Sequence, residues 1–333
     1  MSRATSKATG VALKEQVTEG AGSGPPESTV PAVVPATSGP RRRRVGFSRL
    51  SGLLFIVPSL ILIVTFFIAP FVFNGAFAFI NWTSFSNRLS WAGLGNFTYI
   101  WDFGVLGQAI KVTAIYAVVV MIVENVVSLA LAVMLQRTSA VNSVFRTFFF
   151  VPVLISPLAA GYIWQAILSP HGPLNTLISA VIPGTFHYAW LGHSTSALIC
   201  VASVEAWKWS GLTTLVYIAG LNSVPRSVLE AATVDGAGQW TRFWRIKAPL
   251  LGPAFTFNVV VTFVGALSAF DVIMSTTSGG PGNATTVLNV ALYQQYAQGF
   301  FGNASALSLV VTGLVIATAV PLVTWLRRRE VAM

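Results

Sequence analysis

Six stretches of this chain are each long and apolar enough to cross a lipid bilayer as a helix. A bilayer core of about 30 Å takes roughly 20 helical residues. Backbone groups cannot remain unpaired in hydrocarbon, so such stretches form helices. We therefore predict an all-α, polytopic membrane protein with six transmembrane helices near Leu50–Phe73, Ala114–Leu135, Val144–Leu168, Ala197–Leu221, Leu250–Ser275 and Ala304–Leu326.

The composition agrees with a membrane protein and excludes most soluble classes. Of 333 residues, 54% are hydrophobic and only 9% are charged, whereas soluble globular proteins carry about 25% charged residues. The single cysteine, Cys200, cannot form a disulfide within the chain, and no Cys/His cluster has metal-ligand spacing. We expect no metal or cofactor in this chain.

Residues 1–46 differ from the remainder of the chain. They are rich in Ser, Thr, Gly, Pro and Ala, show no apolar periodicity and end in the basic run Arg41–Arg44. Such a segment cannot bury enough apolar surface to fold alone. We predict a disordered cytoplasmic tail at 1–46, followed by one six-span membrane domain at 47–333.

The basic residues are distributed unevenly between the loops. Seventeen of the 20 lie in the tail, in the loops after spans two and four, or after span six. Because basic loops stay in the cytoplasm, this distribution predicts that both termini are cytoplasmic and that residues 74–113, 169–196 and 276–303 face outward. The net charge of +10 therefore reflects topology, and we expect no nucleic-acid partner.

Four Asn-x-Ser/Thr triplets fall in the predicted outer loops, starting at Asn81, Asn96, Asn283 and Asn303. Such triplets are common by chance and act as glycosylation acceptors only in a eukaryotic secretory pathway. They are set aside as modification sites.

The loop at 222–253 is long compared with the other predicted cytoplasmic loops. Pro225 suits a first helical turn, and Ser227 with Glu230 has capping-box spacing, which predicts a short helix that Gly236 or Gly238 can end.

Two interpretations of this loop are equally consistent with its residues. The small residues Ala231 and Ala232 form a surface that another protein's backbone can approach. Alternatively, the segment lies on the membrane surface as an amphipathic helix, because aromatic residues alternate with basic ones: Trp240, Arg242, Phe243, Trp244, Arg245 and Lys247.

The same loop resembles the EAA loop of ABC importer permeases, whose pattern is EAA-x3-G-x9-I-x-LP. Glu230-Ala231-Ala232, Gly236, Ile246 and Pro249 match it in type and spacing, with Ala248 in place of Leu. Further segments resemble the maltose and glycerol-3-phosphate type of sugar permease: Ile218–Leu221 with Val224-Pro225, Phe270-Asp271 with Ser278–Pro281 and Thr285-Thr286, and Gly302–Ala306.

This resemblance implies a permease subunit of a bacterial plasma-membrane importer, with a carbohydrate as the solute. It implies four kinds of partner: a second permease subunit, an ATP-binding cassette ATPase dimer, an extracytoplasmic solute-binding protein and membrane lipid. The residues implied to contact the ATPase are Glu230, Ala231, Ala232, Asp235 and Gly236. No lysine follows a glycine, so the chain lacks a P-loop, and ATP with Mg²⁺ is expected on the ATPase subunits.

Charged residues inside the predicted spans are candidates for function, because each costs about 2.5–3.5 kcal/mol at the membrane centre. For Glu124 in span two, the favoured interpretation is structural, as part of an internal ion pair or as a tether between helices. Glu205 and Lys208 in span four have i,i+3 spacing, so we expect them to pair. Trp207 and Trp209 offer flat faces beside them, near the depth where transporter sites lie.

The resemblance adds the outer half of span five, around Ser268 and Asp271, to this expected solute path. A second class of protein also fits the intramembrane acids: a proton-coupled secondary transporter that uses Glu124, Glu205 or Asp271 as a relay. That interpretation gives the loop at 222–253 no role, so we favour the importer. The sequence does not identify the solute.

Overall fold

The computed structural model describes residues 49–86, 88–137, 139–182 and 185–331, and the predicted tail at 1–46 lies outside them. The chain divides into two compact units, Met1–Ile56 and Val57–Met333. The helices that pack against one another belong to the second unit. Almost all described elements are helical. In chain order they are α1 (Arg49–Ile63), the π-helix η1 (Val64–Ile68), α2 (Ala69–Phe77), β1 (Ile80–Asn81), β2 (Ser90–Trp91), α3 (Gly95–Asp102), α4 (Val105–Leu135), α5 (Ala140–Leu154), α6 (Pro157–Ile167), α7 (Pro173–Val181), α8 (Ser194–Asn222), α9 (Arg226–Val234), α10 (Gln239–Arg242), the π-helix η2 (Phe243–Lys247), α11 (Ala248–Leu250), α12 (Gly252–Leu267), α13 (Asp271–Thr276), α14 (Leu288–Ala297) and α15 (Phe301–Val331).

Three single helices in the described residues are long and apolar enough to cross a membrane: Ile56–Phe77, Val105–Leu135 and Phe301–Arg328. Two further pairs qualify if each bent pair counts as one span: Ala140–Leu154 with Pro157–Ile167, and Gln239–Leu250 with Gly252–Leu267. The expectation of a membrane-embedded helical protein therefore stands, with three to five spans by this test rather than six.

The predicted fourth span is one continuous helix, α8, but it is too polar to meet the same criterion. Its polar side chains face other helices, since α8 packs against α4, α5 and α12. Lys208, Ser210, Thr213 and Thr214 are all buried. A helix enclosed by protein does not need the apolar surface that lipid demands, and this explains its composition.

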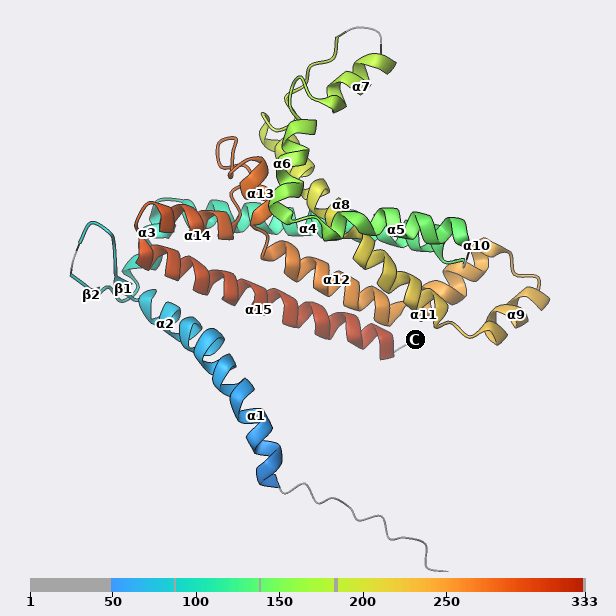
Figure 1. The fold of residues 1–333 in the computed structure, drawn as a ribbon, viewed down its shortest axis with the longest axis horizontal. Helices are drawn as coiled ribbons and strands as arrows, with labels where there is room; N and C mark the ends of the chain where they lie inside the picture. Colours follow the sequence, from blue (N-terminus) through green and yellow to red (C-terminus); the bar gives the residue numbers. More distant parts are fainter. Residues whose placement is uncertain (1–48, 87, 138, 183–184, 332–333) are drawn as a thin grey trace, which may run out of the picture. The chain divides into compact units, whose positions relative to one another are not determined.

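The third predicted span, 144–168, is wrong as a single crossing helix. It consists of α5 and α6, whose axes differ by 102°. Pro157 stands at the first position of α6, and Ser156 before it is extended, with ψ 138°. Proline restricts the preceding residue to such extended geometry and removes an amide donor, so the helix breaks here. Within the second unit, α6 and α7 consequently leave the layer that contains α4, α12 and α15 (Figure 1).

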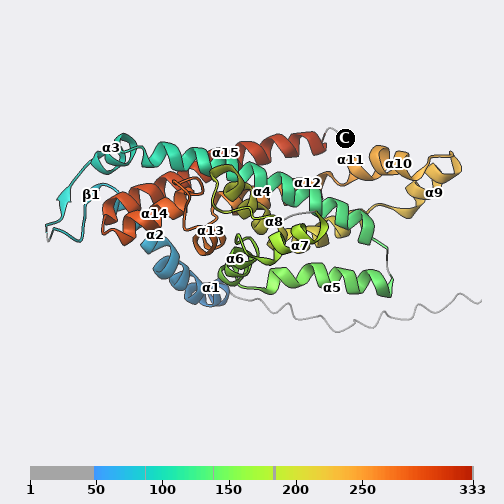
Figure 2. The ribbon, with the colours of Figure 1, turned by 90° about the horizontal axis from the view of Figure 1, so that it is seen from above.

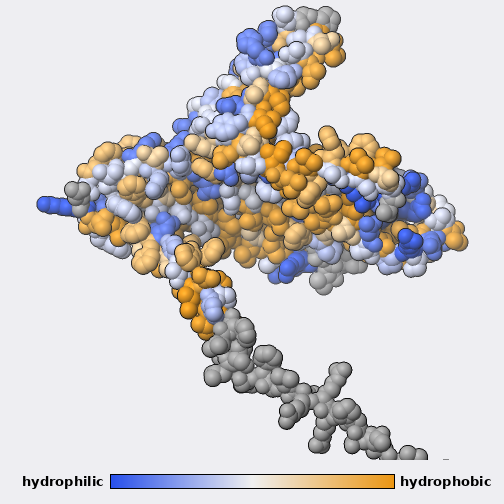
Figure 3. Space-filling model, in the orientation of Figure 1, coloured by the Kyte–Doolittle hydropathy of each residue, from blue (hydrophilic) through white to orange (hydrophobic). Residues whose placement is uncertain are grey.

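The second view shows α4, α8 and α12 gathered at the centre of the second unit, with α5 along one side (Figure 2). Apolar side chains cover the helical middle, whereas hydrophilic ones gather around α9 and α10 (Figure 3). The exposed large apolar side chains of the second unit include Val126, Val144 and Phe148, which are 63%, 70% and 69% exposed. Apolar patches of this extent suit contact with lipid or with another membrane subunit.

Candidate functional site

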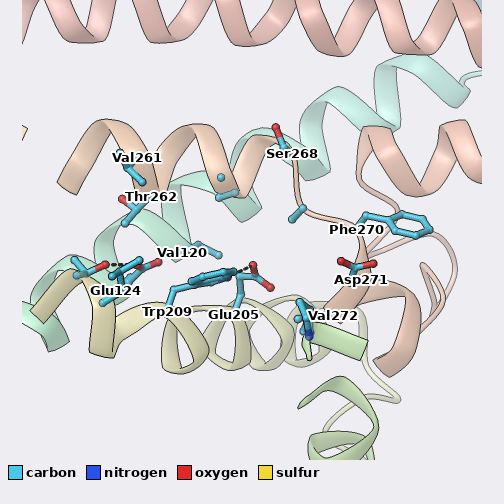
Figure 4. A pocket seen from close by; sticks show the side chains of 16 residues that line it. Val120, Glu124, Glu205, Trp209, Val261, Thr262, Ser268, Phe270, Asp271 and Val272 are labelled. Carbon is cyan, nitrogen blue, oxygen red and sulfur yellow. Dashed lines mark hydrogen bonds between the residues drawn. The ribbon is translucent and has the colours of Figure 1, made fainter. Parts of the chain in front are cut away.

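A cavity of about 370 Å³ lies between α4, α8, α12 and the segment that joins α12 to α13 (Figure 4). Glu124, Glu205 and Asp271 contribute carboxylates to it, and Trp209 and Phe270 contribute aromatic rings. The other lining residues are apolar or carry hydroxyl groups: Val120, Pro157, Leu212, Thr213, Val261, Thr262, Gly265, Ala266, Ser268, Ala269 and Val272.

Trp209 has a fixed orientation at the cavity. It lies one helical turn after Glu205 on α8, and its indole Nε1 donates a hydrogen bond to Oε1 of Glu205 at 3.0 Å. The ammonium Nζ of Lys208 lies 4.1 Å from the centre of the Trp209 ring, at cation–π distance. The indole therefore separates the acid and the base that were expected to pair.

Glu124 both joins two helices and lines the cavity. Its side chain is 3% exposed, and Oε1 accepts a hydrogen bond from the Thr213 hydroxyl at 2.6 Å. This contact joins the middle of α4 to the middle of α8, as the tether interpretation predicts. The position of Glu124 on the cavity wall was not expected.

Four of the six solute-path residues predicted from sequence line the cavity: Glu205, Trp209, Ser268 and Asp271. Ser268 caps the C-terminus of α12 and Asp271 begins α13, so the break between these helices places both side chains at the wall.

Trp207 and Lys208 do not line the cavity. The Trp207 ring packs edge-on against Trp164, with 5.4 Å between ring centres. Lys208 is 1% exposed, and its Nζ donates to the carbonyl oxygen of Val153 at 3.4 Å. Among the described residues, no ion pair joins Lys208 to Glu205, so the predicted pairing is wrong.

Hydrogen bonds between side chains hold the walls of the cavity together. Asn125 on α4 donates to the Thr262 hydroxyl on α12 at 2.8 Å and accepts from the Tyr217 hydroxyl on α8 at 2.6 Å. Asn258 on α12 donates to the backbone carbonyl of Thr213 at 3.2 Å. Buried networks in which the groups are paired rigidify a core, so these three helices form a stiff frame around the cavity. This network could not be predicted from the sequence, because isolated Asn and Thr residues in apolar runs give no sign of their partners.

The segment at 222–253 forms a second candidate site, at the end of the second unit near α9 and α10 (Figure 1). Helix α9 ends as predicted at Gly236, whose φ is +76°. The amide of Ala237 donates to the Ala232 carbonyl at 2.9 Å and that of Gly236 to the Thr233 carbonyl at 3.1 Å, which is a Schellman motif. Glycine suits this left-handed position because it has no Cβ.

The predicted capping box at Ser227 and Glu230 is not formed. Pro225 is itself the N-cap of α9, so the helix starts at Arg226 and no side chain caps it. Since the cap position falls two residues before Ser227, its hydroxyl lies within the first helical turn and not at the N-cap, where a side chain accepts from the free amides.

Most of the residues implied to contact an ATPase lie on the surface of this segment. Glu230, Ala231, Asp235 and Gly236 are exposed, whereas Ala232 is 8% exposed and packs inside the chain. Exposed apolar side chains surround them, namely Val228, Val234, Trp240 and Trp244, with Val234 at 88%.

One hydrogen bond holds the segment together internally, and another attaches it to the rest of the chain. Arg242 donates to the Thr233 hydroxyl at 2.6 Å, and Lys247 donates to Oε1 of Gln136, just after α4, at 2.8 Å. The far end of the segment is therefore connected directly to the end of α4, one wall of the cavity.

Comparison with known proteins assigns this architecture to a class. Residues 124–329 match the family described as binding-protein-dependent transport system inner membrane component. The probable starch degradation products transport system permease protein AmyD of Thermoanaerobacterium thermosulfurigenes is 30% identical over 84% of this chain and 95% of that protein. The sn-glycerol-3-phosphate transport system permease protein UgpA of Rhizobium meliloti is 31% identical over 79% of this chain and 90% of its own length.

The fold also matches solved structures. A bacterial ABC transporter involved in the import of the acidic polysaccharide alginate aligns with a TM-score of 0.73 at 22% identity, over 84% of this chain and 96% of that chain. The family match and the relatives named as permease proteins define a membrane transport component. The chain belongs to the family of binding-protein-dependent transport system inner membrane components.

Proposed function

We propose that the chain is the permease subunit of an ATP-driven importer whose solute is a carbohydrate and passes through the cavity beside Trp209. The observation that carries this proposal is the combination of a fixed indole with carboxylates at one cavity. A sugar ring packs its apolar face on an indole, and its hydroxyl groups donate to carboxylate oxygens. Relatives named for starch degradation products, multiple sugars and lactose support the same solute class.

The segment at 222–253 is proposed as the contact with an ATPase subunit. Its exposed apolar and acidic side chains fit a protein partner, and its bond from Lys247 to Gln136 offers a direct route to α4. ATP and Mg²⁺ would be bound by that partner. A second permease subunit and an extracytoplasmic solute-binding protein complete the proposed assembly, and both termini of this chain face the cytoplasm.

The proposal is tested by the energy source of uptake in cells that express the complete system. Uptake of a labelled oligosaccharide is expected to stop with vanadate, which blocks ABC ATPases, and to continue when an uncoupler collapses the proton gradient at constant ATP. The opposite pattern would favour the proton-coupled alternative, for which three carboxylates at one cavity would serve as the relay.

The role of the cavity is tested in the same cells with Trp209→Ala, which removes the proposed stacking surface. Uptake is expected to fall at least tenfold. Trp101→Ala is the matched control, because Trp101 is 63% exposed on α3 and does not line the cavity. Equal uptake by both variants would contradict the assignment of the cavity.

A further inference from the structure

The charges at the cavity restrict the chemical class of its solute. Glu124, Glu205 and Asp271 all line it, and none of its sixteen lining residues is Lys, Arg or His. The nearby base Lys208 does not reach the space: it is 1% exposed, and its ammonium lies against the Trp209 ring and donates to the Val153 carbonyl. Within the part of the chain that the structure describes, the cavity wall therefore offers no cation to a solute.

An anionic solute is unfavourable here whatever the protonation state of the acids. Where the carboxylates are ionised, like charges repel, and at an effective dielectric of about 20 each carboxylate about 6 Å from the anion lowers its affinity about a hundredfold. Where they carry a proton, the anion leaves water without gaining a partner charge, which is also costly.

An uncharged saccharide meets complementary groups at the same wall. The hydrogen bond between Trp209 and Oε1 of Glu205 leaves Oε2 of that carboxylate free to accept from a sugar hydroxyl. Asp271 is exposed toward the cavity at the start of α13 (Figure 4). The volume of about 370 Å³ has room for more than one sugar ring.

We infer that this chain selects uncharged saccharides and excludes anionic solutes such as sugar phosphates and uronates. This inference rests on the proposed function and narrows it. It separates the chain from two proteins that it resembles, since one is named for sn-glycerol-3-phosphate and another imports an acidic polysaccharide.

The test measures the binding of saccharide probes to the purified permease–ATPase complex in lipid nanodiscs. The solute-binding protein is left out, because it could itself discriminate between uncharged and anionic saccharides. The probes are maltotriose, cellotriose and lactose, each with a derivative in which one C6 hydroxymethyl group is oxidised to a carboxylate. Saturation-transfer NMR titrations compare each pair. The uncharged parent is expected to bind at least a hundredfold more tightly than its carboxylate derivative.

Charge-neutralising variants identify the source of this preference. Glu205→Gln keeps an acceptor for the Trp209 indole, and Asp271→Asn alters an exposed side chain, so neither change threatens the fold. Together they are expected to reduce the penalty for the carboxylate probe at least tenfold. Asp102→Asn, the same change on exposed α3 outside the cavity, is expected to leave the penalty unchanged.

The outcomes separate this inference from the proposed function. Equal binding of an uncharged probe and its carboxylate derivative by the unmodified complex overturns the inference and leaves the carbohydrate importer standing. Tighter binding of the carboxylate derivative also overturns the inference and also leaves the carbohydrate importer standing. If none of the probes binds, the cavity is not a saccharide site and both conclusions fall.

Discussion

Lys208 shows how one buried side chain can satisfy a break in a neighbouring helix. The Val153 carbonyl lies in the last turn of α5 and would bond to the amide of residue 157, but that residue is proline and has none. The Lys208 ammonium donates to this oxygen instead. The residue therefore holds the bend between α5 and α6 against α8.

Replacing this lysine with an apolar residue of similar length tests its structural role. Lys208→Met is expected to cost about 1–3 kcal/mol, because the carbonyl loses its donor in a buried place. Thermal unfolding of the purified complex measures the loss, and recovery of assembled complex should fall with it. Lys111→Met is the control, since Lys111 is exposed on α4. A Lys208→Met complex of normal stability without uptake would instead assign Lys208 to solute handling.

At the scale of elements, α8 and α5 approach each other closely at Gly211. A Cβ added there would lie 2.3 Å from the Phe149 carbonyl oxygen and 2.9 Å from the Phe150 Cα, both backbone atoms. Gly211→Ala is therefore expected to push the two helices apart and to lower the melting temperature of the complex, because overpacking costs about 1–3 kcal/mol.

Gly107→Ala provides the matched comparison for this change. Gly107 also lies in a long helix, α4, but a Cβ there would have nothing within 4 Å. This variant should melt at the normal temperature or slightly above it. Identical behaviour of the two variants would show that α5 and α8 can separate without cost.

The turn after α9 makes a different prediction. Gly236→Val places a β-branched residue at φ +76°, whereas Gly238→Ala alters a nearby glycine at φ −66°. Only the first change strains the backbone. We expect Gly236→Val complexes to insert normally but to lose solute-stimulated ATP hydrolysis, while Gly238→Ala complexes retain it. If both variants lose solute-stimulated ATP hydrolysis, or if both retain it, the conformation of Gly236 is not what couples transport to ATP hydrolysis.

At the scale of the whole molecule, the orientation in the membrane can be tested with the single native cysteine removed. In a Cys200→Ala background, Ser86→Cys and Ser227→Cys each place one thiol at an exposed position. An impermeant maleimide should label only Ser86→Cys in intact cells and both after lysis. Labelling of Ser227→Cys in intact cells would reverse the orientation inferred from the basic residues.

The features that sequence could predict are those set by local chemistry. Apolar runs located the helices, and the loop pattern located the turn at Gly236, because both depend on neighbours in the chain. The single span predicted over Val144–Leu168 proved to be two helices, because the 102° angle between them depends on packing as well as on Pro157. The i,i+3 spacing of Glu205 and Lys208 suggested a pair, yet each has a different partner: the Trp209 indole for Glu205, and the Val153 carbonyl with the Trp209 face for Lys208.

The polarity of α8 has a consequence for how the protein is made. A helix that carries Glu205, Lys208 and several hydroxyl groups gains little from entering lipid alone, since each charged residue opposes insertion by about 2.5–3.5 kcal/mol. Its hydrogen bonds from Thr213 to Glu124 and from Tyr217 to Asn125 require α4 to be present. We therefore expect ordered biogenesis, in which α4 enters first and stays beside the insertion machinery until α8 emerges from the ribosome to join it.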